Sequence, residues 1–301
     1  MELLAIFVQN ILPIFIVACI GFLIVRYLEA DVRTLSRVTI YVLTPCLLFD
    51  VLVTSDVSAD EFGRLTLLAL GTILGIGLIA WLAARALRLD RVMTSAFMVV
   101  VMFANGGNYG LPLTLFVFGQ EALARATIYF VVSIVLTYTI GIFLASSGRR
   151  SLGEALLSVL RIPSIYASAA AIVVIFTGVA TPSLLMRPIK LLGDAAIPVM
   201  ILVLGMQLER AVKPARLRLV GLAVGLRLIV SALLGLLLAQ FLGLGGAARQ
   251  AGVLQSAMPV AVVTTILAVE FEVEPAFVTS VVFLSTILSP LTLTPLIALL
   301  K

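Results

Sequence analysis

Long apolar runs separated by short polar connections make up nearly the whole chain. A helix that spans a membrane needs about 20 mostly apolar residues, and the connections leave no room for a water-soluble domain. We therefore expect an all-α integral membrane protein with ten transmembrane helices. The predicted spans are 3–25, 37–54, 65–84, 92–118, 126–145, 162–180, 191–208, 219–242, 248–269 and 275–299.

The composition agrees with a membrane protein. Of the 301 residues, 62% are hydrophobic and 12% are charged, and the mean hydropathy is +1.24, whereas a soluble domain contains about 25% charged residues. The net charge of +5 is spread between the apolar runs, so it indicates membrane orientation and not nucleic-acid binding. There is no histidine, and both cysteines lie inside apolar runs, so we expect no metal site and no cofactor.

The Lys and Arg residues of the connections predict an orientation, because cytoplasmic loops are enriched in them. If the N-terminus lies outside, the inside connections hold thirteen Lys or Arg residues and the outside ones hold six. We therefore expect a multi-pass protein of the cytoplasmic (inner) membrane, with both termini on the outer, periplasmic side.

Prolines inside the predicted spans recur at about half the chain length. The pairs, 150, 153 and 147 residues apart, are Pro13 and Pro163, Pro45 and Pro198, and Pro112 and Pro259. Three matches in the same order favour a duplication over coincidence. A unit of five helices crosses the membrane an odd number of times, so its second copy must be inverted, as in many transporters. We predict two inverted five-helix repeats, at 1–148 and 149–301.

Two predicted spans contain helix-disfavouring residues near their middle. The fourth holds the run Asn105-Gly-Gly-Asn-Tyr-Gly-Leu-Pro112, and the ninth holds Gln255-Ser-Ala-Met-Pro259. Three glycines and a proline within eight residues disfavour a helix, and unwound backbone in a membrane must be buried in protein or line a wet cavity. We predict two broken helices that cross near the midplane and restart with Pro112 and Pro259 in their first turns.

The glycines have a second explanation, because small residues also let membrane helices pack closely. Gly71 and Gly75, and likewise Gly221 and Gly225, stand four residues apart and are expected to serve that purpose. In the fourth span the asparagines favour a binding site over packing alone, since an amide in hydrocarbon needs a partner.

The chemistry of the two breaks favours an anionic substrate. A restarted helix presents free N–H groups and the positive end of its dipole, and neither break contains a carboxylate. The candidate substrate-binding residues are Asn105, Gly107, Asn108, Tyr109, Pro112, Gln255, Ser256, Met258 and Pro259, with Arg227 of the eighth span.

Charged residues inside other spans are further candidates. A charge deep in a membrane costs at least about 2.5–3.5 kcal/mol on insertion scales. Arg227 is therefore expected to meet a substrate carboxylate or an intramembrane acid, or else to reach the inner interface by snorkelling. Asp50 and Asp194 lie nearer the outer face and could couple transport to H⁺, although Asp194 could equally cap the start of its helix.

The fourth span resembles the signature of the auxin efflux carrier family, which includes bacterial permeases predicted to carry malonate or malate. The resemblance extends over essentially the whole chain. Further similarities are Pro45-x-x-x-Phe49, Ala196-x-Pro198 with Leu204-Gly205 and Leu208, and Met258-Pro259. PIN-type plant exporters are similar but have an Asn-Pro-Asn form of the motif and a long central loop, which this chain lacks.

The resemblance implies an inverted-repeat fold like that of bile-acid symporters and NhaA-type antiporters. Spans 1, 2, 6 and 7 (about 3–54 and 162–208) would form a scaffold that often makes a homodimer. Spans 3–5 and 8–10 (about 65–145 and 219–299) would form a moving bundle with the substrate at the crossing. The residues that fall on the family's crossing positions are Asn105, Asn108, Pro112 and Pro259.

We therefore expect a secondary transporter, not an enzyme, that moves a small organic anion such as a mono- or dicarboxylate by an elevator or rocking motion. No nucleotide-binding, HExxH or GxSxG motif is present. Two alternatives stay open. A sodium-coupled importer of the same fold would hold Na⁺ with Asn105, Gln255, Thr264 and Thr265, and a channel or sensor would have kept the fold without alternating access.

Overall fold

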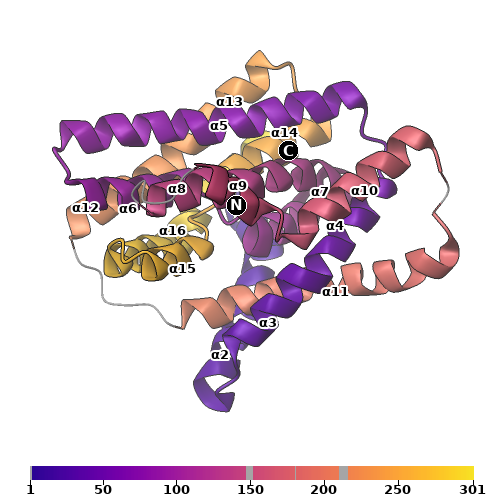
Figure 1. The fold of residues 1–301 in the computed structure, drawn as a ribbon, viewed down its shortest axis with the longest axis horizontal. Coiled ribbons are helices and arrows are strands. Elements are labelled where there is room, and N and C mark those ends of the chain that lie inside the picture. The colour runs from indigo at the N-terminus through magenta and orange to yellow at the C-terminus, as the bar shows by residue number, and fades with distance from the viewer. Residues whose placement is uncertain (1, 147–151, 180, 210–215) are drawn as a thin grey trace.

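The computed structural model describes residues 2–146, 152–179, 181–209 and 216–301. In this part of the chain the regular structure is helical, apart from one isolated β-bridge, and the elements labelled η are π-helical turns (Figure 1). The elements of the first half are α1 (Glu2–Ile6), η1 (Phe7–Ile11), α2 (Leu12–Leu28), α3 (Val32–Val38), η2 (Thr39–Leu43), α4 (Thr44–Val53), α5 (Ala59–Ala86), α6 (Arg91–Met102), η3 (Gly106–Gly110), α7 (Leu111–Leu136), η4 (Thr137–Gly141) and α8 (Ile142–Ala145). Those of the second half are α9 (Leu152–Val159), α10 (Pro163–Thr177), α11 (Ser183–Leu208), α12 (Leu217–Gly225), η5 (Leu226–Val230), α13 (Ser231–Phe241), α14 (Gly246–Ser256), α15 (Val263–Glu270) and α16 (Pro275–Leu300).

Among the residues that the structure describes, seven helical stretches are long and apolar enough to cross a membrane, which agrees with an integral membrane protein. The fourth and ninth predicted spans are each divided, and the sixth corresponds to α10, a helix of 15 residues. The second half of the fourth span continues with the fifth as one stretch, Gly106–Ala145, which bends at Gly119 (φ 79°, ψ −168°). Ten separate crossings therefore remain a prediction.

The matched prolines of the two predicted repeats lie in different local structures. Those that follow a π turn by two residues are Pro13, Pro45 and Pro112. A proline ring clashes with the carbonyl four residues earlier, and in each case that carbonyl lies within the wider π turn. Their counterparts differ: Pro163 begins α10, Pro198 lies inside α11, and Pro259 is not helical. The inverted repeat is not confirmed by local structure.

The helices form two groups, visible in Figure 1. In one group α2 packs against α11, and α4 packs against α10 and α11. In the other, α5 packs against α6, α7 and α13, and α14 packs against α7 and α13. The groups meet where η3 and α7 contact α11, and where α7 contacts α4. This contact places the run that begins at Gly106 at the boundary between the groups.

The helices α2 and α11 cross with their backbones in contact. A Cβ atom added to Gly205 would overlap the carbonyl oxygen of Ala18, and one added to Gly21 would overlap that of Leu202. Small residues at such a crossing let membrane helices gain close van der Waals contact. These two glycines therefore hold the first group of helices together.

The two glycine pairs that were predicted to pack closely lie in different surroundings. Gly71 and Gly75 lie against side chains of α13, so the prediction of close packing is confirmed for them. No described atom lies within 4 Å of a Cβ built on Gly221 or Gly225. The prediction is wrong for that pair within this chain, because their side of α12 faces outwards.

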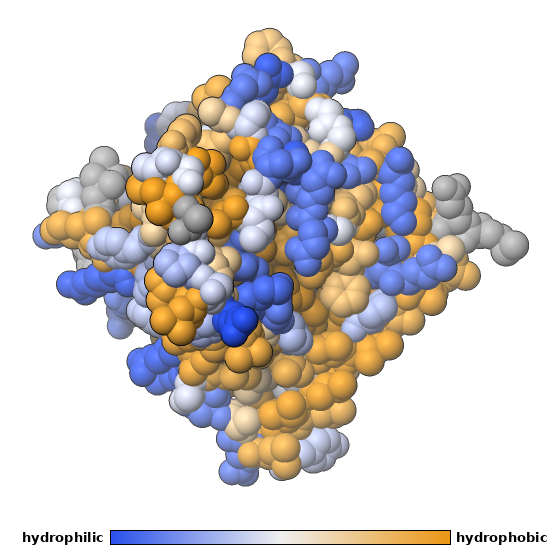
Figure 2. Space-filling view, turned by 90° about the vertical axis from the view of Figure 1, so that its right-hand side faces the viewer, coloured by the Kyte–Doolittle hydropathy of each residue, from blue (hydrophilic) through white to orange (hydrophobic). Residues whose placement is uncertain are grey.

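Large apolar side chains cover much of the outer surface. In Figure 2 broad areas of apolar residues surround narrower groups of hydrophilic ones. On α10 and α11 the side chains of Phe176, Leu184 and Leu191 are more than 70% exposed. Such a surface is suited to the hydrocarbon of a bilayer and not to water.

Candidate functional site

The interruptions of the fourth and ninth predicted spans pair with each other. The backbone N–H of Asn105 donates to the carbonyl of Pro259 (2.7 Å), and the N–H of Ala261 donates to that of Phe103 (2.9 Å). Ala104 and Val260 face each other in the antiparallel bridge between these bonds. Unwound backbone in a membrane must find internal partners, so the two breaks stabilise each other and bring together segments about 155 residues apart.

The glycines after the first break do not unwind the helix, which corrects our expectation for the run 105–112. Only the residues between α6 and η3 leave the helical path, and η3 restarts at Gly106. A Cβ on Gly106 or Gly110 would lie 2.8 or 2.6 Å from Oε1 of Gln255, and one on Gly107 would lie 2.9 Å from the ring of Phe130. These glycines are required because Gln255 and Phe130 lie directly against the helix.

The two prolines of the breaks do not play the same part. Pro112 stands in the first turn of α7, although the helical path begins earlier, at Gly106. Pro259 lies in the unwound segment itself, four residues before α15 begins at Val263. The prediction that Pro259 starts the second half-helix is therefore wrong, and its carbonyl instead accepts the bond from Asn105.

Two buried amide groups at the crossing have polar atoms without a partner among the described residues. They are Nδ2 of Asn105, whose residue is 6% exposed, and Oε1 of Gln255, whose residue is fully buried. The other amide atom of Gln255, Nε2, donates to the carbonyl of Gly106 (3.4 Å). An unsatisfied buried polar atom costs about 1–3 kcal/mol, so each one requires an explanation, such as a bound water, an ion or a functional role.

Arg227 is fully enclosed between the two broken helices. Its Nη1 donates to the carbonyls of Val101 (3.0 Å) and Met102 (3.1 Å), at the end of α6. Its Nη2 donates to the carbonyl of Ser256, at the end of α14, and to the hydroxyl of Ser231 (2.6 Å). The side chain neither pairs with an acid through these bonds nor reaches an interface, so neither of those two expectations holds.

The charge of Arg227 complements the dipoles of the helices that it joins. The last carbonyls of a helix have no intrahelical donors and form a negative end equivalent to about half an elementary charge. Two such ends meet at Arg227, so their sum is close to the single positive charge of the guanidinium. Ser231, which sequence reasoning missed, supports the same point because its hydroxyl also donates to the Ser256 carbonyl (2.9 Å).

Asn108 faces the boundary between the two helix groups. Its Nδ2 lies 3.5 Å from Oε1 of Gln207, and Nε2 of Gln207 lies 3.5 Å from the hydroxyl of Ser36. All three residues are half-buried. Gln207 was not among the candidates from sequence, although a lone amide in an apolar span was the available signal. The three side chains form a polar link from η3 to α11 and α3.

The remaining candidates near the crossing are tied into the protein. Tyr109 is fully buried, its hydroxyl accepts from Ser289 (3.2 Å), and its ring meets that of Phe15 edge-on (centroids 6.1 Å apart). Met258 is fully buried in the core, and Thr264 donates to the carbonyl of Ala261 (2.6 Å). Thr265, one residue later, is half-buried on α15 and donates its backbone N–H to Val262.

The two candidate coupling acids lie beside the same lysine. Lys190 is 3.1 Å from Asp194 and 4.0 Å from Asp50. Asp194 lies well inside α11, which begins at Ser183, so it is not an N-cap. The structure thus brings Asp50 and Asp194 together in one ion cluster, and their shared ionic partner is Lys190.

A family model and two relatives each match most of the chain. A family model described as a membrane transport protein matches residues 6–154 and again 146–297. A protein of Methanothermobacter thermautotrophicus, named as an uncharacterized transporter, is 28% identical over 93% of this chain and 94% of its own length. Another so named, from Methanocaldococcus jannaschii, is 24% identical over 87% of each chain.

Proposed function

The chain belongs to the membrane transport protein family, in agreement with its resemblance to the auxin efflux carriers, and we propose that this transporter moves a small organic anion, a mono- or dicarboxylate. The substrate would bind where the two breaks pair, against the N-terminus of η3. The observation that supports this most directly is the distribution of charge around the pairing.

The charge of Arg227 balances the negative C-terminal ends of α6 and α14 at the crossing. The positive N-terminal ends of η3 and α15 are not balanced in this way. The half-helices that restart at Gly106 and at Val263 each present about half a positive charge, and neither break contains a carboxylate. An anion is the ligand that such a pair of N-termini favours. Nδ2 of Asn105 adds a donor that has no partner among the described residues.

The burial of the proposed site supports transport by alternating access. Asn105 and Gln255 are closed off from solvent, whereas Asn108 is half-buried at the boundary of the two helix groups. A substrate could reach them if the group of α5–α8 and α12–α16 moves, as an elevator or by rocking, against the scaffold of α2, α4, α10 and α11. The link from Asn108 through Gln207 to Ser36 would break and re-form in that movement.

A thermal-shift screen of the purified protein against small mono- and dicarboxylates tests the proposal. A ligand that binds only the folded state raises the apparent stability by mass action. We expect stabilisation by at least one carboxylate in the absence of sodium. If no carboxylate stabilises the protein, the proposed substrate class is wrong.

A sodium-coupled importer remains the second candidate because Oε1 of Gln255 is a buried oxygen without a partner among the described residues. Oxygen atoms are the ligands of hard cations. Stabilisation that appears only with sodium would favour this function over the first. A saturable flux with counterflow would in turn distinguish either carrier from a channel or sensor.

The isosteric change Asn105→Asp separates an anion site from a cation site. It replaces the unused donor with a negative charge, so we expect affinity for a carboxylate to fall about tenfold or more, since like charges repel strongly in a buried site. Sodium binding should persist or strengthen. Gln240→Glu, the same type of change at an exposed position of α13, should leave both unchanged; an unchanged carboxylate affinity in Asn105→Asp would contradict the proposed site.

Asn108→Ala tests the role of the half-buried amide. If this side chain binds substrate, affinity should fall about tenfold, because a hydrogen bond to a charged group contributes roughly 1.5–3 kcal/mol, and expression should be intact. Transport by this variant at the wild-type rate and affinity would exclude Asn108 from binding.

The proposed orientation has both termini on the periplasmic side of the inner membrane, in two inverted repeats of five crossings each. Epitope tags at the two ends of the chain should then react with a membrane-impermeant probe from the same side. Tags found on opposite sides would require an odd number of crossings. A homodimer through the scaffold helices would place the exposed apolar side chains of α10 and α11 in contact.

A further inference from the structure

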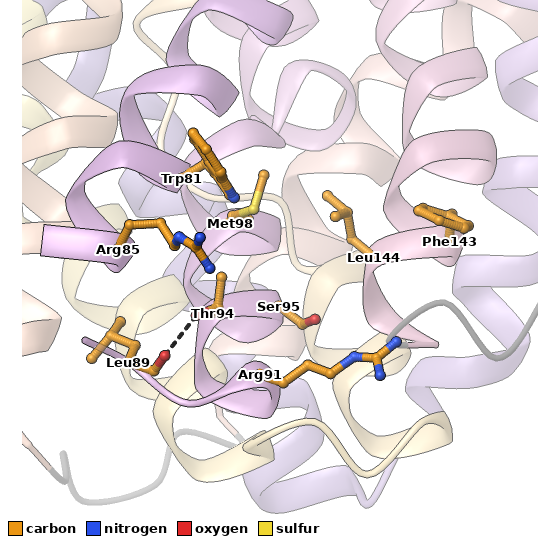
Figure 3. A pocket seen from close by; sticks show the side chains of 9 residues that line it. All are labelled: Trp81, Arg85, Leu89, Arg91, Thr94, Ser95, Met98, Phe143 and Leu144. Atoms are coloured by element: carbon orange, nitrogen blue, oxygen red, sulfur yellow. Dashed lines mark hydrogen bonds between the residues drawn. The ribbon is translucent and has the colours of Figure 1, made fainter. Parts of the chain in front are cut away.

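A cavity of about 480 Å³ lies apart from the paired breaks, where α5, α6 and α8 come together (Figure 3). It is within the size range of small-molecule sites, about 300–1,000 Å³. The last turns of α5 contribute Trp81 and Arg85, and the first turns of α6 contribute Arg91, Thr94 and Met98. None of these residues belongs to the proposed transport site.

Two arginine side chains belong to the lining of the cavity. Arg85 and Arg91 both line it, and the guanidinium of Arg85 lies 5.5 Å from the centre of the Trp81 ring. A guanidinium held over an aromatic ring still carries its N–H donors in its own plane. The acid at this turn, Asp90, accepts the backbone N–H of Met93 (2.8 Å) and caps α6. Two guanidinium groups therefore line the cavity.

Apart from the arginines and the hydroxyl residues Thr94 and Ser95, the lining is apolar. This apolar part continues onto the outer side of α5. Figure 3 shows Phe143 and Leu144 of α8 on the side of the cavity opposite Trp81. Trp81 itself is 41% exposed. The exposed leucines that form one row on α5 and end beside Arg85 are Leu67, Leu74, Leu78 and Leu82. An occupant would thus meet guanidinium groups at one end and hydrocarbon-like surface at the other.

We propose that this cavity binds the phosphate headgroup of an anionic phospholipid, whose acyl chains lie along the leucine row of α5. Arginine pairs with phosphate oxygens through parallel hydrogen bonds, tryptophan favours the headgroup level of a bilayer, and basic pockets between membrane helices suit anionic lipids. A free phosphate would use the arginines but not the leucine row. The site is independent of the transported substrate.

Native mass spectrometry of the full chain in detergent tests the proposal, with dioleoyl-phosphatidylglycerol, dioleoyl-phosphatidylcholine and glycerol 3-phosphate as probes. We expect the anionic lipid to bind at least about fivefold more tightly than the zwitterionic one. Arg85→Gln and Arg91→Gln should each weaken the anionic lipid about fivefold, the effect of one basic residue near a lipid surface. Arg85→Lys keeps the charge but not the planar fork and should weaken it less.

Arg88→Gln is the matched control, because Arg88 stands in the same turn but does not line the cavity. It removes the same charge and should leave lipid binding unchanged. Equal binding of the two lipids would overturn the proposal. So would an equal loss in Arg88→Gln and Arg85→Gln, which would indicate diffuse surface charge, or binding of glycerol 3-phosphate as tight as that of the lipid, which would indicate a soluble ligand.

Discussion

Replacement of Arg227 by methionine is expected to destabilise the protein by several kcal/mol and to abolish transport. The change leaves the carbonyls of Val101 and Met102 buried without the donor they now share, and it removes one of the two donors of the Ser256 carbonyl. Each such group costs about 1–3 kcal/mol, and removal of one partner from a buried charged network typically costs about 3–5 kcal/mol. Thermal unfolding of the detergent-purified protein, with transport in vesicles, measures both effects.

Arg227→Lys should fall between the wild type and the methionine variant. An ammonium group keeps the charge that opposes the two helix ends, but it cannot bond α6 through one nitrogen and α14 through another as the guanidinium does. If Arg227 were an interfacial anchor, lysine would be nearly silent. A lysine variant with wild-type stability and transport would therefore contradict this role.

Arg218→Met is the appropriate control because Arg218 is exposed on α12, which leads directly into η5, where Arg227 lies. It removes the same charge without breaking a described bond to α6 or α14, so we expect a change in stability of no more than about 0.5 kcal/mol. Equal destabilisation by the two methionine variants would show that Arg227 acts through net charge alone.

Gly205→Ala is expected to have the second large effect, a loss of about 1–3 kcal/mol or more. The added methyl group would overlap the carbonyl oxygen of Ala18, and a backbone atom within a packed helix cannot move aside as a flexible side chain can. The helices α2 and α11 would have to separate. Thermal unfolding should show the loss, and a cross-link between the two helices should form less readily.

Gly221→Ala makes the same chemical change where no described atom lies within 4 Å of the new methyl group. Alanine is the better helix former by up to about 1 kcal/mol, so this variant should be as stable as the wild type or slightly more stable. The opposite sign of the two effects separates packing from intrinsic helix propensity. Equal and small effects at both positions would contradict a close crossing of α2 and α11.

Several features of the site could be predicted from local sequence. Both interruptions were found, because the glycines, prolines and amides that mark them stand within a few residues of one another and conflict with the apolar flanks. Asn105, Asn108 and Gln255 were chosen for the same reason. The expectation that the glycines unwind the helix failed because propensity describes an isolated helix, whereas Gly106 and Gly110 are required by a side chain 145 or more residues away.

The role of Arg227 shows the same limit. A buried charge in an apolar span could be recognised as costly from sequence, so a partner was expected. The partners considered were acidic groups and the membrane interface, because both can be inferred from the residue types along the sequence. Beside the hydroxyl of Ser231, the actual partners are main-chain carbonyls, which every residue has, and only the ending of α6 and α14 side by side makes three of them available.

The sequence by itself determined the class of this protein: an apolar, multi-pass membrane protein with two broken helices and a family signature in one of them. Hydrophobic length and helix-breaking composition are local properties, so they can be read without coordinates. Only the tertiary structure decided that the breaks pair with each other, that Arg227 joins two helix ends, and that the matched prolines lie in unlike settings. These are contacts between segments that lie far apart in the sequence. Their energies depend on which backbone groups have no partner within their own helix, and that is known only once the helices are packed.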